Sequence, residues 1–248
     1  MKECDMSISQ KITEILNDLN YLENAYFTNL ENGHFDKNDF IETQIQFYFA
    51  VTFFSRPMAA LAAKIPLPKM RLEIVRNVWE EHGEGNFKNA HAHTFEELLK
   101  RLGNVSVEDI QKRALWPEVR LFNTALIGIS VLDDYMTGIG VMGIIEHMFS
   151  SISHKIGTGI IKRGWLNEQT IIHYGVHEKL DVKHSQDFFD IVAGAYQTSA
   201  ENKYYIDQGI WLGATLFHSM YQQLYEHRKR RIFRDITTPH SRAEGIPC

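Results

Sequence analysis

The sequence predicts an all-α protein built as a single helical bundle. Glycine and proline are scarce, at 16 and 6 of 248 residues, so few positions interrupt a helix. Apolar residues recur at helical spacing along most of the chain, and β-branched residues mostly fall inside these patterns. The hydrophobic content of 44% supplies a packed core. There is no repeat of fixed period and no linker-like segment, so one bundle is the simplest organisation.

The first half of the chain is expected to form six helices separated by turn-forming segments. "ENGHFD" ends the first, "KIPLP" separates the third from the fourth, and "HGEGN" and "RLGN" mark later breaks. Two of the helices are expected to begin at a proline. The expected ranges are 7–30, 39–54, 57–64, 68–81, 90–102 and 107–115.

The second half is expected to form five helices, with "KRGWLN" as its main turn. The basic run "EHRKRRIFRD" near the C-terminus is interpreted as a solvated helix end whose positive charges suit the helix dipole, with partner docking as the alternative. The expected ranges are 118–134, 142–156, 167–174, 176–199 and 201–233.

Charge and cysteine content narrow the class of partner and the compartment. A net charge of −5 predicts no nucleic-acid and no membrane partner. The two cysteines, Cys4 and Cys248, are terminal, so we expect no structural disulfide and a cytoplasmic location. The N-terminus has no apolar run typical of a secretory signal. The most apolar region, 121–149, contains two aspartates that leave pieces too short to cross a bilayer.

The segment "HEKLDVKH" carries three candidate metal ligands, His177, Asp181 and His184. At 3.6 residues per turn these positions fall within roughly 60° of arc on one helical face. Charged residues surround them, so a solvated stripe is the alternative interpretation.

Two other segments place carboxylates or imidazoles inside apolar helices. "NVWEEHGEGNFKNAH" contains three glutamates and a histidine, and "GVMGIIEHMFSSI" contains Glu146. A carboxylate in so apolar a helix is costly to bury unless it pairs with a cation or a metal. Histidines and carboxylates from three helices match the needs of a carboxylate-bridged di-iron or di-manganese site, whereas four-coordinate zinc has no use for so many carboxylates.

These motifs resemble those of the heme-oxygenase-like di-iron oxidases and oxygenases, iron-containing redox enzymes that include relatives of the chlamydial death-domain-associating protein. The resemblance covers residues 77–184 and implies a bundle of about seven main helices. It implies one di-iron domain over residues 1–248, with 1–6 and 235–248 as flexible tails. It also implies two Fe(II) ions, O2 as co-substrate and, where needed, an external reductant. The implied ligands are Glu81, His91, Glu146, His177, Asp181 and His184.

Two ligand assignments have alternatives. Glu84 can replace Glu81, and His93 can replace His91, although histidines two residues apart face different sides of a helix. Relatives that oxygenate amine nitrogen resemble one another in having an extra glutamate where this chain has Ser55. The absence of this glutamate favours cleavage of C–H or C–C bonds over oxygenation of nitrogen.

The leading hypothesis is therefore a biosynthetic di-iron oxidase acting on a small carboxylic acid, with an amino acid as the preferred substrate. Arg56 or Lys155 is a candidate for holding the substrate carboxylate, unless both are surface cations. The second hypothesis is self-sacrificing p-aminobenzoate synthesis, with Tyr26 consumed and Lys155 as nitrogen donor. The third is a non-catalytic interaction protein. A thiaminase-like hydrolase is disfavoured because the core has no cysteine, and a homodimer is compatible with each reading.

Overall fold

The computed structural model describes residues 7–234, apart from the side chains of residues 172 and 176–182. The expected tails, 1–6 and 235–248, lie outside the described residues. Over the described part the chain forms ten α-helices and three short 3-10 helices, with one isolated β-bridge, so the predicted all-α class is confirmed. None of the described helices is long and apolar enough to cross a membrane. The helices are α1 (Ile8–Leu19), α2 (Ala25–Glu31), α3 (Lys37–Lys64), α4 (Pro68–Glu81), α5 (His91–Gly103), α6 (Val107–Gln111), α7 (Pro117–Leu132), α8 (Tyr135–Lys162), α9 (Ile172–Thr198) and α10 (Ala200–Glu226), and the 3-10 helices are η1 (Tyr21–Glu23), η2 (Gly83–Gly85) and η3 (Phe87–Asn89).

Several helix boundaries differ from the predicted ones. The predicted helix 7–30 is divided because Asn20 adopts a left-handed conformation, φ 46°, and caps the end of α1. The predicted break before Pro57 is absent, and α3 continues through this proline. A proline inside a helix removes one backbone hydrogen bond, and burial of the α3 side chains on both sides of Pro57 offsets this loss.

The longest helices of the second half were also predicted incorrectly. Helix α8 begins seven residues before the predicted range 142–156, where the Asp134 side chain accepts a hydrogen bond from the backbone of Met136 at 2.8 Å. Helix α9 begins only at Ile172, so residues 167–171 of the predicted range 167–174 are not helical, and α9 continues through Gly175 into the predicted range 176–199.

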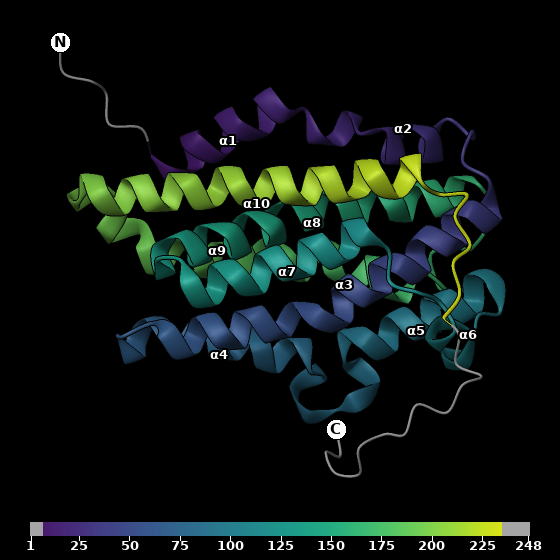
Figure 1. Cartoon of the computed structure of the whole chain (residues 1–248), viewed down its shortest axis with the longest axis horizontal. Helices are drawn as coiled ribbons and strands as arrows, with labels where there is room; N and C mark the ends of the chain where they lie inside the picture. Colours follow the sequence, from purple (N-terminus) through teal and green to yellow (C-terminus); the bar gives the residue numbers. More distant parts are fainter. Residues whose placement is uncertain (1–6, 235–248) are drawn as a thin grey trace.

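The helices lie in a bundle whose long members run along its long axis (Figure 1). Helix α10 lies on one side with α1 outside it, α4 lies on the opposite side, and α7 to α9 lie between them. Helix α8 packs extensively on both α9 and α10. It is buried along most of its length, so any polar side chain in its middle lies in the protein interior.

Glycines allow α8 and α10 to cross closely. A Cβ atom added at Gly209 would lie 2.2 Å from the carbonyl oxygen of Thr137, and one added at Gly140 would lie 2.7 Å from that of Ile206. Both obstacles are backbone atoms, which cannot rotate aside. The crossing therefore requires glycine at these positions and fixes α8 in place.

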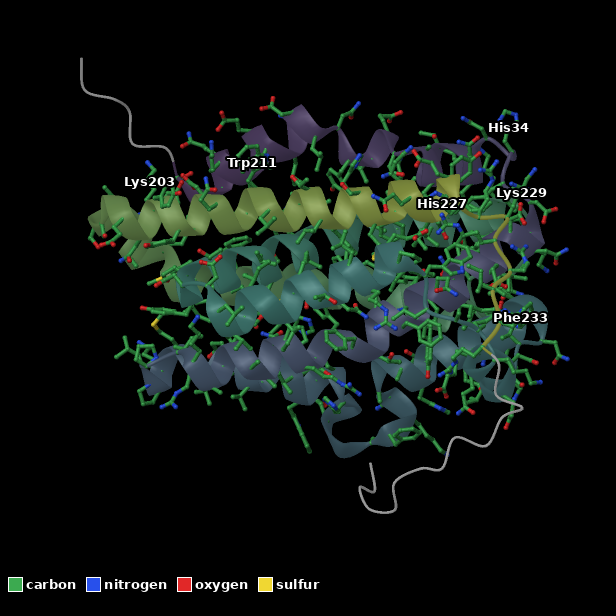
Figure 2. All side chains as sticks on the ribbon, viewed as in Figure 1. His34, Lys203, Trp211, His227, Lys229 and Phe233 are labelled. Carbon is green, nitrogen blue, oxygen red and sulfur yellow. The ribbon has the colours of Figure 1, made fainter. Side chains whose placement is uncertain are left out.

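The basic run near the C-terminus is not a solvated helix end. Helix α10 ends at Glu226. The chain then runs past α6, which is labelled in Figure 1, and Figure 2 labels His227 and Phe233 along this segment. His227 Nδ1 lies 3.0 Å from Oε1 of buried Glu118, and Arg230 donates to both oxygens of that carboxylate. Arg230 thus pairs with a buried acid of its own chain, and Arg231 pairs with Asp39 at 2.7 Å.

Candidate metal centre

Three of the six predicted ligands meet in the core of the bundle. Glu81 is the last residue of α4, Glu146 lies in the middle of α8, and His184 lies on α9. All three are buried, and one donor atom from each lies within 4.8 Å of the others. His184 Nδ1 is 3.7 Å from Glu146 Oε2. Three different helices, α4, α8 and α9, therefore direct acidic and imidazole groups to one point.

His91, the fourth predicted ligand, adjoins this group. Its Nδ1 atom lies 2.8 Å from Glu81 Oε1, and both side chains are 7% exposed. The turn that joins α4 to α5 brings them together. Gly83 has φ 69°, and a Cβ atom there would lie 2.5 Å from the backbone nitrogen of Ala90. A glycine is required at this position for the chain to fold back and start α5 at His91.

The alternatives to Glu81 and His91 lie elsewhere. Glu84 is exposed, in a left-handed conformation with φ 53°. His93 is half-buried, with its Nδ1 3.6 Å from Glu96 Oε2 and its ring against Phe87. The geometry therefore favours Glu81 and His91 as ligands.

His177 and Asp181 lie on α9, in the same helix as His184, but their side chains lie outside the described residues. Their assignment as ligands stays a prediction.

The sequence reasoning missed a further histidine, His173. It is fully buried on α9, and its ring centroid is 6.3 Å from that of His91. Its Nδ1 lies 2.9 Å from the hydroxyl oxygen of Thr94, which donates to the backbone carbonyl of His91 at 3.0 Å. The signal was available, because position 173 is one helical turn before His177 and shares the ligand face of the helix.

A second missed residue is Glu80, which precedes the predicted ligand Glu81. Its Oε2 atom lies 2.6 Å from His184 Nε2. Its Oε1 atom lies 3.8 Å from Arg76 Nε and 3.9 Å from Lys183 Nζ. Glu80 therefore connects a buried candidate ligand to cations nearer the surface.

A small apolar cavity of about 40 Å³ adjoins the candidate ligands. A space of this size holds only a few water molecules. One wall is formed by Glu81, His91, Glu146 and His173, and the rest is apolar and largely aromatic. The apolar lining comprises Phe47, Ala50, Val51, Phe54, Phe122, Ile145, Phe149 and Phe217. A ligand in this cavity would contact hydrocarbon on one side and the candidate metal ligands on the other.

The two cations proposed to hold a substrate carboxylate do not line this cavity. Arg56 is exposed, with its guanidinium over the ring of Phe53. Lys155 is half-buried and donates to the backbone carbonyl of Leu22 at 2.9 Å.

Tyr26 is fully buried within a hydrogen-bond network and is likewise absent from the cavity wall. Its hydroxyl lies 2.7 Å from Thr43 Oγ1 and accepts from Gln44 Nε2 at 2.7 Å. Gln44 in turn accepts from the Tyr174 hydroxyl at 2.5 Å. Burial raises the pKa of Tyr26 above its ordinary value of 10, so this phenol stays protonated near neutral pH.

The described donor set fits iron. Two buried carboxylates beside two imidazoles supply the mixture of oxygen and nitrogen donors typical of non-heme iron sites. Glu81 Oε1 lies 2.8 Å from His91 Nδ1, Glu146 Oε2 lies 3.7 Å from His184 Nδ1, and a divalent cation would offset the cost of burying the two negative charges.

Comparisons with known proteins agree with this fit. Residues 42–218 match the model of a family described as iron-containing redox enzymes. No curated protein matches the sequence.

Among solved structures, a heme-oxygenase-like domain of unknown function from Shewanella denitrificans is similar, with a TM-score of 0.72 and 14% identity over 89% of this chain and 91% of that one. A TenA homolog from Pseudomonas syringae gives a TM-score of 0.71 and 15% identity over 91% and 98% of the two chains. A TenA homologue from Pyrococcus furiosus gives 0.67 and 13% over 88% and 99%. At these identities the likeness establishes the heme-oxygenase-like fold.

Proposed function

The chain belongs to the family of iron-containing redox enzymes, and from that membership we propose that it is an O2-dependent non-heme di-iron oxidase. It cleaves C–H or C–C bonds of a small carboxylic acid, most favourably an amino acid. The observation that carries the proposal is the meeting of buried Glu81, Glu146 and His184 in the core, where the two glutamates also line an aromatic cavity.

The protein's own residues have three tasks in this reaction. Glu81 and Glu146 would hold the metal ions with oxygen donors, and His91 and His184 would hold them with nitrogen donors. Bound Fe(II) supplies the electrons that activate O2. The phenylalanines of the cavity exclude bulk water, which protects a reactive centre from side reactions.

The cavity wall narrows the substrate class. Its described lining contains no lysine or arginine, so the metal site itself provides the positive charge that a substrate carboxylate needs. The aromatic side chains pack best against hydrocarbon. The space of about 40 Å³ is smaller than an amino acid, so the aromatic side chains must move apart to admit one, and we favour amino acids with an apolar side chain over polar or basic ones.

Helix α3 supports bond cleavage over oxygenation of an amine. Ser55 is half-buried, and α3 contains no acidic residue from Tyr48 to its end at Lys64. The site thus lacks the extra glutamate implied for relatives that oxygenate nitrogen. The expected products are an alkene, a nitrile, a ring or a shortened chain.

The self-sacrificing alternative finds less support. It requires Tyr26 to react with a centre whose adjoining cavity it does not line, and its hydroxyl is held by Thr43 and Gln44. Intact-protein mass spectrometry after turnover distinguishes the two: an external substrate leaves the chain mass unchanged, whereas consumption of a tyrosine alters it.

The proposal is tested by loading the protein anaerobically with Fe(II) and mixing it with O2, a reductant and a panel of amino acids and fatty acids. We expect O2 uptake that is accelerated by apolar amino acids and abolished by Glu146→Gln, with Glu84→Gln as the matched exposed control. Products that carry new oxygen on the amine would refute the assigned reaction type. Uptake that no member of the panel accelerates would refute the substrate class.

A further inference from the structure

We propose that Glu80 is the positioning residue of His184: it accepts a hydrogen bond from Nε2 and so presents Nδ1 as the metal-binding atom. The inference rests on the proposed function insofar as His184 is a metal ligand. It concerns a residue outside the predicted ligand set and assigns different tasks to two consecutive glutamates.

The first argument is the hydrogen-bond chemistry of the pair. Glu80 Oε2 and His184 Nε2 are 2.6 Å apart. An ionised carboxylate only accepts hydrogen bonds, so the proton between these atoms belongs to Nε2. In a neutral imidazole the other nitrogen, Nδ1, then carries the lone pair, and this is the atom 3.7 Å from Glu146 Oε2.

The second argument is that both partners are held in place. The His184 side chain is 0% exposed, so water does not replace Glu80 as its partner. The other oxygen of Glu80 faces the cations of Arg76 and Lys183. These two are fixed by Asp187, whose Oδ2 accepts from Arg76 at 2.7 Å and from Lys183 at 3.0 Å. These two cations hold the Glu80 side chain in its orientation toward His184.

The third argument separates Glu80 from the metal ligands. Glu80 does not line the cavity that Glu81, His91 and Glu146 line. Its contact of 2.6 Å with His184 Nε2 is typical of a charge-assisted hydrogen bond. A carboxylate that orients a ligating histidine in this way raises the basicity of the ligand and fixes its tautomer.

The test compares Glu80→Ala and Glu80→Gln with Glu84→Gln, which alters an exposed glutamate four residues away. Anaerobic titration with Fe(II) gives the affinity and the number of ions bound at saturation. Long-range 1H–15N correlation spectra of the metal-free protein give the tautomer of His184. Circular dichroism establishes that each variant is folded, and the wild-type spectrum decides the tautomer even if Glu80→Ala does not fold.

We expect Glu80→Ala to weaken metal binding about 10–100-fold without changing the number of ions at saturation. Glu80→Gln should weaken metal binding less than Glu80→Ala does, because its amide oxygen still accepts a hydrogen bond from Nε2. Glu84→Gln should bind Fe(II) with the affinity of the wild type. The wild-type spectrum should show the proton on Nε2. An Nδ1–H tautomer, an unchanged affinity in Glu80→Ala, or the loss of a whole ion at saturation would each overturn the inference. A wild-type protein that binds no metal would refute the proposed function instead.

Discussion

Replacement of Gly209 by alanine should destabilise the protein because it forces α8 and α10 apart. The added Cβ atom would lie 2.2 Å from the carbonyl oxygen of Thr137 and 3.1 Å from the Cα atom of Gly140, both of which belong to a rigid helix. Overpacking typically costs about 1–3 kcal/mol. We expect a cost at the upper end of this range, because the atoms that the new Cβ would meet belong to the backbone and cannot rotate aside. Alanine regains about 1 kcal/mol of helix propensity, so we expect a net loss of about 2 kcal/mol or more.

The free energy of unfolding is measured by chemical denaturation, with Gly194→Ala as the control. Gly194 is an exposed glycine of α9, and a Cβ atom there meets nothing within 4 Å. This control should be stabilised by about 0.5–1 kcal/mol. A Gly209→Ala protein as stable as the wild type would show that the two helices do not cross as closely as described.

Three further predictions concern the buried ion pair, the cavity and the metal-free state. Arg113 forms an ion pair with buried Glu42, to which its Nε atom donates at 3.1 and 3.0 Å. Arg113→Ala should lower the free energy of unfolding by about 2–3 kcal/mol, because Glu42 then keeps only Arg231, 3.7 Å away. The exposed neighbour Lys112→Ala should change it by less than about 1 kcal/mol. Ala50→Leu should fill the cavity, which abolishes substrate-dependent O2 uptake with iron content retained, whereas exposed Ala59→Leu should not; equal uptake by the two variants would contradict the cavity assignment. Backbone amides of α9 should exchange more slowly with solvent after Fe(II) loading, and equal exchange rates would count against metal binding by this helix.

Part of the site was predictable because burial of charge is costly. Glu146 stands out in an apolar helix, and the spacing of His177, Asp181 and His184 assigns them to one face without knowledge of any neighbour. In the structure, Glu146 and His184 lie together with Glu81. Such local signals predict which side chains converge but not which groups hold them.

The role of Glu80 could not be predicted in this way. Consecutive glutamates are equivalent in sequence. Only the packing of α9 against the end of α4 places Glu80 against His184, whereas the turn from α4 to α5 places Glu81 against His91. The start of α8 was also not predictable, because it depends on packing against another helix. Its first turns contain glycines that disfavour an isolated helix, yet one of them, Gly140, is what allows α10 to approach.

We propose that this chain holds two iron ions in the core of its bundle. The most direct measurement is the iron content of protein loaded anaerobically with Fe(II), alongside Glu146→Ala, His184→Ala and the control Glu84→Ala. We expect close to two ions per chain for the wild type and the control. Each ligand variant should lose at least one. Binding of a single zinc ion in preference to iron, or no binding after loading, would contradict the claim.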